Sequence, residues 1–301
     1  MSDTAALPTM NNRVRTLLVV GAWLGMGLAT VMPAPAESSD ETHPAPSLMI
    51  STEYTGRAAL RRADDSFAFT AYTFDFEWLV ALFEYDHRRY DWRTRGAADD
   101  APWRTLNVLA PGVQYYRTIG EHGGVWAKVR ARASYESTLG SRSWTWNPQV
   151  LGFRSAWGRW TLYGGAGALY HPVDPVYYPV LGLATTPEDG HGFAGAVGFP
   201  ETMARYRFNE RYAVKADFHW SIRIHELDRD NARAPAGFVR MVDRTPGLYL
   251  EYSPTRALTI SPGVRRRMGR SITLYDDDQD KLESSRVRGA WTAIVNVEYT
   301  F

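Results

Sequence analysis

The residues best suited to chemistry are a histidine and a serine two positions apart, His219 and Ser221. If this segment is a β-strand, the two side chains share one face, and a His–Ser proton relay for acyl hydrolysis is conceivable. The same face carries Lys215, Asp217 and Arg223. These charged neighbours favour a polar strand of a barrel wall over a catalytic pair, so we expect that the protein is not an enzyme. The enzymatic alternative is a lipid hydrolase of the deacylase kind.

A second candidate is the acidic run Asp276-Asp277-Asp278-Gln279-Asp280. Alternate aspartates can hold calcium, but a calcium loop of the EF-hand type needs a glycine and a glutamate where Lys281 and Val287 stand. We therefore expect a solvated acidic loop, no metal site and no cofactor.

Basic side chains recur on the polar faces of several predicted strands. If those faces enclose water, the excess of positive charge favours small polar or anionic solutes. The alternative is an interior plugged by arginine–carboxylate pairs. The predicted interior-lining residues are Lys128, Arg130, Arg132, Lys215, Asp217, His219, Arg223, Arg265, Arg267 and Glu298.

Strict two-residue alternation defines the elements that would position these side chains. The clearest cases are residues 211–226 and the C-terminal stretch 287–301, where apolar and mostly polar residues alternate. The pattern predicts fourteen strands at 48–57, 66–76, 78–92, 103–118, 124–137, 144–157, 159–170, 176–185, 191–199, 202–208, 211–226, 237–253, 256–270 and 287–301. The ninth and tenth are short, and twelve wall strands remain if they form a separate hairpin.

The predicted connections alternate between short turns and longer polar loops. Short turns are expected near Phe76, Asn209 and Pro254, and longer loops at 93–102 and 271–286. This asymmetry is typical of a transmembrane antiparallel β-barrel whose apolar faces meet lipid. A soluble β-sandwich could show the same alternation in single strands.

The N-terminal segment indicates export. Arg13 and Arg15 precede an apolar run, and Ala34-Pro35-Ala36 supplies a small-residue cleavage pattern. We expect a signal peptide at 1–36, a flexible periplasmic tail at 37–46 and a barrel at 47–301. The chain has no cysteine, so neither disulfides nor a lipid-modified cysteine is expected. The mature chain would carry 32 basic and 32 acidic residues, which gives no reason to expect a nucleic-acid partner.

Three short motifs carry a resemblance to a family. They are Tyr178-Pro179-Val180-Leu181-Gly182, Val197-Gly198-Phe199-Pro200-Glu201 and Arg205-Tyr206-Arg207-Phe208-Asn209. In this arrangement the chain resembles an uncharacterised family of Gram-negative outer-membrane β-barrel proteins. The resemblance implies a barrel in the outer membrane and implies no activity. The terminal aromatics Tyr299 and Phe301 are similar to a barrel-assembly signal, which implies the assembly machinery, membrane lipid and lipopolysaccharide as partners.

These observations together favour a passive pore or binding barrel for small polar or anionic solutes. A structural or surface barrel with a blocked lumen is the main alternative. The sequence leaves the solute, the oligomeric state and the openness of the lumen undecided.

Overall fold

The fold is taken from a computed structural model. The residues whose structure is described are 45–61, 65–94, 101–120, 122–157, 159–185 and 191–301. The predicted signal peptide at 1–36 and all but the last two residues of the predicted tail at 37–46 lie outside these ranges. No helix long and apolar enough to cross a membrane occurs in the described ranges.

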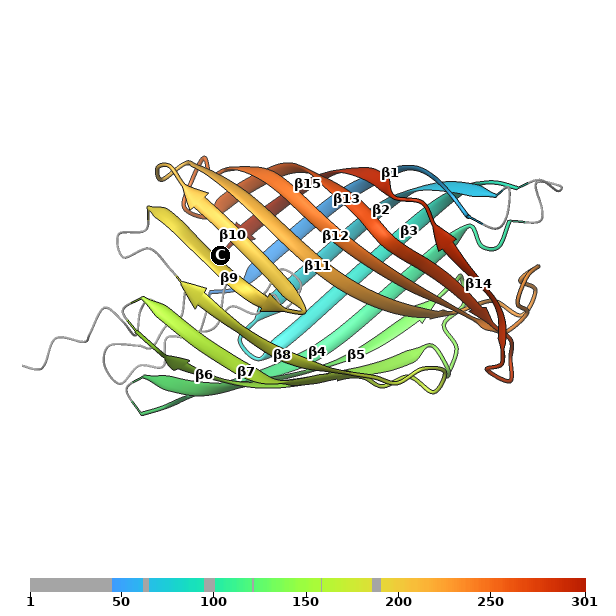
Figure 1. Cartoon of the computed structure of the whole chain (residues 1–301), viewed down its shortest axis with the longest axis horizontal. Helices are drawn as coiled ribbons and strands as arrows, with labels where there is room; N and C mark the ends of the chain where they lie inside the picture. Colours follow the sequence, from blue (N-terminus) through green and yellow to red (C-terminus); the bar gives the residue numbers. More distant parts are fainter. Residues whose placement is uncertain (1–44, 62–64, 95–100, 121, 158, 186–190) are drawn as a thin grey trace, which may run out of the picture.

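The described chain is built from antiparallel strands that follow one another around a barrel (Figure 1). The strands are β1 (Ser47–Ala59), β2 (Ser66–Trp78), β3 (Ala81–Arg93), β4 (Thr105–Ile119), β5 (Gly123–Tyr135), β6 (Trp144–Ser155), β7 (Trp160–Leu169), β8 (Val176–Thr185), β9 (Gly192–Phe199), β10 (Glu201–Arg207), β11 (Tyr212–Glu226), β12 (Phe238–Tyr252), β13 (Leu258–Tyr275), β14 (Lys281–Val287) and β15 (Ala290–Thr300).

The sheet closes on itself, because β12 pairs with β13, β13 with β15, and β15 with β1. β14 and β15 occupy one position in the wall, interrupted only at Arg288 and Gly289. β14 pairs with the upper part of β13, and its Val287 bridges Leu60 just beyond β1. The predicted all-β antiparallel barrel of fourteen strands is therefore confirmed, with β9 and β10 as short members of the wall.

The prediction of a loop at residues 271–286 is wrong. β13 continues to Tyr275 and β14 begins at Lys281, so only the acidic run remains as a turn. Gly269, at a φ of 59°, lies beside a shift in register between β12 and β13. This irregularity lets the strand bend and continue. The polar sequence of 276–286 concealed the extension because strands beyond a lipid-covered belt need no apolar face.

The outer surface of the barrel is apolar, as the alternation predicted. In β15 the outward Trp291, Val295 and Tyr299 are 62%, 45% and 42% exposed, whereas the intervening Thr292 and Asn296 are buried. A soluble sandwich would bury such side chains against a second sheet, whereas a barrel in lipid leaves them outside.

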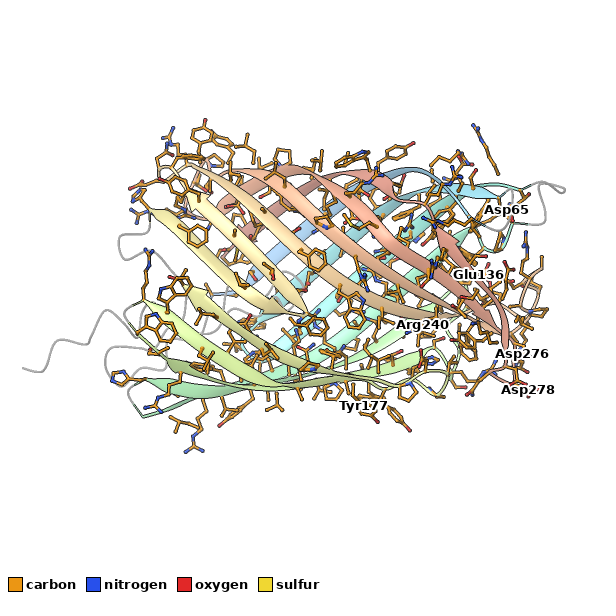
Figure 2. All side chains as sticks on the ribbon, viewed as in Figure 1. Asp65, Glu136, Tyr177, Arg240, Asp276 and Asp278 are labelled. Carbon is orange, nitrogen blue, oxygen red and sulfur yellow. The ribbon has the colours of Figure 1, made fainter. Side chains whose placement is uncertain are left out.

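The two ends of the barrel differ. We call the end with residues 79–80, 208–211 and 253–257 the short-turn end, and the end with 101–104, 136–143, 227–237 and 276–280 the long-loop end. Figure 1 shows the C-terminus near the short-turn end, and Figure 2 shows Asp65, Glu136 and Asp276 together at the other. Apart from the short β9 and β10, and with β14 and β15 counted as one strand, the strands run from the short-turn end to the long-loop end.

Candidate functional site

A cavity of about 210 Å³ lies inside the barrel. Its wall includes seven of the ten predicted interior residues: Arg130, Arg132, Lys215, His219, Arg223, Arg265 and Arg267. The other three, Lys128, Asp217 and Glu298, lie on the same strand faces but outside the cavity lining. Whether any of them selects a solute remains a prediction.

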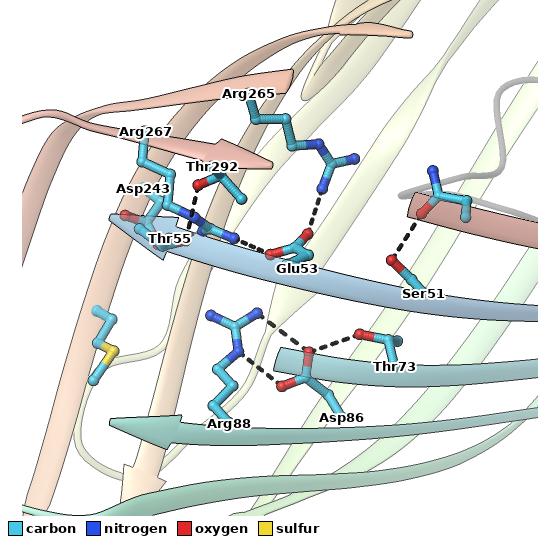
Figure 3. A network of polar contacts seen from close by, with 12 residues as sticks. Ser51, Glu53, Thr55, Thr73, Asp86, Arg88, Asp243, Arg265, Arg267 and Thr292 are labelled. Carbon is cyan, nitrogen blue, oxygen red and sulfur yellow. Dashed lines mark hydrogen bonds and ion pairs between the residues drawn. The ribbon is translucent and has the colours of Figure 1, made fainter. Parts of the chain in front are cut away.

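The most connected part of the cavity wall is a layer of ion pairs on β1, β12 and β13 (Figure 3). Glu53 accepts hydrogen bonds from Arg265 at 2.8 Å and from Arg267 at 2.5 Å. Arg267 also donates to Asp243 at 3.3 Å, and Arg270 donates to Asp243 at 2.8 Å. These side chains are mostly buried, and each charge has a counter-charge within hydrogen-bonding distance.

The neighbouring strands continue this polar layer. On β3, Arg88 donates to Asp86 at 2.8 Å, and Asp86 also accepts from Thr73 of β2 at 3.2 Å. Both members of the Arg88–Asp86 pair are almost fully buried. Figure 3 shows the pair beside Glu53, so four strands (β1, β3, β12 and β13) place charged side chains close together.

Two of the predicted selectivity residues are engaged in a second cluster. Arg130 and Arg132 both donate to Glu84, at 2.9 and 3.1 Å. Arg130 also lies 3.7 Å from carboxylate oxygens of Asp75 and Glu77. These guanidinium groups are partly neutralised by the wall itself, which reduces their availability to a solute.

Carboxylates complete the site, and the predicted inward strand faces include three of them. The alternation that predicted the arginines also places Glu53, Glu84 and Asp86 on inward faces, so the signal was present. The lining contains five acidic side chains (Glu53, Asp75, Glu84, Asp86 and Glu201) and seven basic ones (Arg88, Arg130, Arg132, Lys215, Arg223, Arg265 and Arg267). Among the lining residues, basic side chains therefore exceed acidic ones by two when His219 is neutral, although Asp217, Asp243 and Glu251, which pair with Arg265, Arg267 and Lys215, lie outside the lining.

His219 contacts a carboxylate and not the neighbouring serine. Its Nδ1 lies 2.9 Å from Glu201 of β10. No hydrogen bond joins it to Ser221 within the part of the chain that the structure describes. Both side chains line the interior cavity, so the arrangement offers no His–Ser relay on the lipid-facing surface.

The long-loop end of the interior is filled by a packed apolar cluster. Its members come from both sides of the barrel, including Phe67 and Phe69 of β2, Val239 of β12 and the loop residue Trp103, which is 1% exposed. The hydroxyl of Tyr90 reaches the sulfur of Met241 across the lumen at 3.7 Å. We call this cluster the apolar plug. Its aromatic residues pack inside the barrel and not on the outer surface.

Loops from separate strands are tied together above the plug. Arg233 pairs with Asp65 at 2.8 Å, joining the β11–β12 and β1–β2 connections. Asn231 donates to the Pro102 carbonyl at 2.5 Å and to Glu136 at 2.9 Å. Burial raises the pKa of the Glu136 carboxyl above its ordinary value. These contacts hold the loops over the plug at this end of the barrel.

Part of the interior wall over β5–β9 is apolar. Trp126, Phe153, Tyr163 and Val180 pack together there, with Trp220 of β11 partly buried against the group. This departs from the prediction of a polar lumen throughout. Of this group, Leu169, Tyr178 and Trp220 also line the cavity, opposite its charged residues in chemistry.

The remaining predicted features lie at the barrel ends. The acidic run forms the β13–β14 turn, where Asp276 accepts from the Asp280 amide at 2.8 Å and Asp277 pairs with Arg142. No group of three or more His, Cys, Asp or Glu side chains suited to a metal ion occurs among the described residues. Tyr299 and Phe301 form an edge-to-face ring pair, and both are exposed on the outer surface. Their role in assembly stays a prediction.

No protein-family model matches the chain, and no curated protein matches it either. Among solved structures, it is similar to an outer membrane channel from Pseudomonas putida F1, with a TM-score of 0.43, 10% identity, and coverage of 89% of this chain and 99% of that one. It is also similar to the KdgM porin, with a TM-score of 0.34, 9% identity, and coverage of 84% and 99%.

A third similar structure is an outer membrane protease from Escherichia coli, with a TM-score of 0.29, 8% identity, and coverage of 88% and 99%. Channels and a protease thus occur at comparable, low similarity. The activity of this chain has to be argued from its own residues.

Proposed function

We propose that this chain forms an outer-membrane β-barrel that takes small anionic solutes into its interior cavity. The observation that carries the proposal is the charged lining of the cavity, where basic side chains exceed acidic ones by two. A closed cavity with one sign of charge in excess concentrates counter-ions. The apolar outer surface supports residence in lipid, and the short-turn end would face the periplasm.

In this proposal the barrel is a binding barrel and channel whose long-loop end is closed by the apolar plug. Membrane lipid, lipopolysaccharide and the barrel-assembly machinery are its proposed partners. Reversal potentials in planar bilayers across a potassium chloride gradient test the charge preference. We expect a small conductance that favours chloride over potassium.

A matched pair of variants tests the role of the plug. Trp103→Ala removes the largest fully buried side chain of the plug, and Trp291→Ala removes an outward tryptophan of the same size. We expect a larger conductance for the first variant and an unchanged one for the second, with heat-modifiable migration confirming that both are folded. Equal conductances would remove the plug from the permeation path.

The second candidate is a structural barrel with a blocked lumen, and the packed plug is the observation that favours it. It predicts no conductance and no anion binding in the folded wild-type protein. A lipid hydrolase is the least supported alternative. It predicts a lipase or deacylase activity that His219→Ala abolishes.

A further inference from the structure

The barrel wall is incomplete between β8 and β11. β11 pairs with β10 only as far as His219, and its next contact on that side is Glu226 with Tyr135 of β5. β8 pairs with β9 only from Leu181 onward. We call the interval between residues 176–180 of β8 and residues 220–225 of β11 the seam. Figure 1 shows the corresponding opening in the ribbon beside the tip of the β9–β10 hairpin.

The interior cavity extends into the seam. Trp220, Ser221, Ile222 and Arg223 all line it, although successive side chains of a strand point to opposite faces. In a closed wall only alternate residues could reach the interior. The cavity therefore reaches the free edge of β11. Leu169 of β7 and Tyr178 of β8 line the side of the cavity that faces this edge.

The outer side of the seam is covered by the β7–β8 connection. His171 lies 5.3 Å from the ring of Phe238, and Asp174 pairs with Arg240 at 2.7 Å. Phe238 and Arg240 alternate with the inward Val239 and Met241, so they lie on the outer face of β12. The connection thus overlaps the wall from outside.

The burial of outward residues on β11 agrees with this overlap. Ile222 is 6% exposed and Ile224 is 5% exposed, whereas Phe218, on the same outer face, is 40% exposed. Only the two isoleucines lie within the seam. They form an apolar layer beneath the β7–β8 connection, and Ile222 also lines the cavity.

The seam also has polar requirements. Successive amides of a strand point to alternate sides, so half of those in residues 220–225 face the seam without a strand partner. Arg223 lines the cavity here, and no carboxylate in the described ranges pairs with it. Unlike Arg130, Arg265 and Arg267, it has its charge available to an incoming anion.

We propose that the seam is a lateral portal between the outer leaflet of the membrane and the cavity, and that it takes amphipathic anions with a carboxylate head and an apolar chain. The chain would lie against Trp220, Ile222 and Leu169, and the carboxylate would pair with Arg223. This inference rests on the proposed function, because it names the class of anion and its route. This sideways route avoids the plug at the long-loop end, and it requires the β7–β8 connection to move aside.

Three probes separate the parts of this proposal: dodecanoate, acetate and dodecanol, measured by calorimetry on protein in nanodiscs after subtraction of empty nanodiscs. We expect dodecanoate to bind at least about tenfold more tightly than either of the others, since both a charge and an apolar chain contribute. Equal binding of acetate and dodecanoate would overturn the portal while leaving the proposed function intact. Absence of binding by both anions, without chloride preference in bilayers, would overturn the proposed function as well.

Variants locate the binding to the seam. Arg223→Gln should weaken dodecanoate binding about tenfold without affecting dodecanol, because it removes one charge-assisted contact. Arg244→Gln, an exposed outward arginine on β12, is the matched control and should bind as wild type does. Equal affinities in the two variants would refute the role of Arg223.

The route is tested with single thiols, which the cysteine-free chain makes unambiguous. Ser221→Cys places a thiol in the seam, and Val264→Cys places one on the exposed outer surface of β13. Modification with a bulky maleimide should abolish dodecanoate binding in the first variant and leave it unchanged in the second. Undiminished binding by labelled, folded Ser221→Cys protein would show that the ligand does not use the seam.

Discussion

Replacing Glu53 by glutamine isolates the contribution of the ion-pair layer. Glu53 is 6% exposed and lies between two guanidinium groups, at 2.8 Å from Arg265 and 2.5 Å from Arg267. The substitution preserves shape and one acceptor oxygen but removes the only negative charge that Arg265 and Arg267 share. Asp217, at 3.5 Å from Arg265, and Asp243, at 3.3 Å from Arg267, compensate in part.

The expected cost follows from these contacts. Hydrogen bonds to charged groups contribute about 1.5–3 kcal/mol each, so the loss of two charge-assisted bonds sets an upper range of about 3–6 kcal/mol. Relief of the carboxylate's desolvation and hydration of Arg265 from the cavity offset part of this loss. We expect Glu53→Gln to lower the free energy of unfolding by roughly 2–4 kcal/mol.

Urea unfolding in lipid vesicles, followed by tryptophan fluorescence, measures this change. Glu210→Gln is the control, because Glu210 is an exposed residue of the β10–β11 turn. Glu53→Gln should also raise the preference for chloride over potassium in bilayers, because the cavity wall gains one net positive charge. A stability within about 0.5 kcal/mol of the control would refute the idea that Glu53 holds the layer together.

Three further predictions follow from other parts of the barrel. Phe218→Arg places a charge on the outer surface and should impair insertion by roughly 2–4 kcal/mol if the side chain sits near the membrane centre, whereas Phe218→Leu should insert normally in a vesicle-folding assay. Gly165→Ala should destabilise the barrel by about 1–3 kcal/mol through overpacking, because a Cβ there would lie 2.0 Å from the Val150 carbonyl oxygen. Gly164→Ala meets nothing within 4 Å and should unfold at the same urea concentration as wild type. Burial lowers the pKa of His171 from 6.5 to about 4, with Asp174 partly opposing the shift. The unfolded chain therefore binds a proton in this interval that the folded chain does not, so stability should fall as the pH drops from 6.5 toward 4. His171→Gln should lose that part of the pH dependence in unfolding titrations, and an identical pH profile would contradict the assignment.

The strands could be predicted from the sequence because a barrel wall requires outward apolar and inward side chains to alternate along every strand. Residues 211–226 alternate throughout, and β11 begins and ends within a residue of the predicted bounds. The rule loses force beyond the lipid-covered belt. Residues 281–287 lack an apolar face, so β14 was assigned to a loop.

Interior contents were less predictable, since alternation gives the face of a side chain and not its partner. It identified Arg130 and Arg132 but could not show that Glu84 binds both. Inward aromatics such as Phe67 and Tyr90 follow the same parity as polar lumen residues. Their packing with Trp103 depends on a loop that folds back into the barrel, a long-range event that local periodicity does not encode.

The seam escaped prediction for a related reason. The shortness of β9 and β10 was visible in the sequence, but its consequence depends on which strands lie on either side. Only the pairing of residues 201–207 with 213–219 shows where β11 loses its neighbour. The four consecutive cavity residues that begin at Trp220 are then the sign of an open edge.

The junction between the first and last strands has a consequence for biogenesis. β1 pairs with β15 over nine consecutive residue pairs, from Ser47 with Thr300 to Thr55 with Thr292. A chain that lacks the final strand would be an open sheet with two unpaired edge strands. Such edges can pair with strands of other molecules. We therefore expect that small C-terminal deletions yield aggregates instead of a slightly frayed barrel.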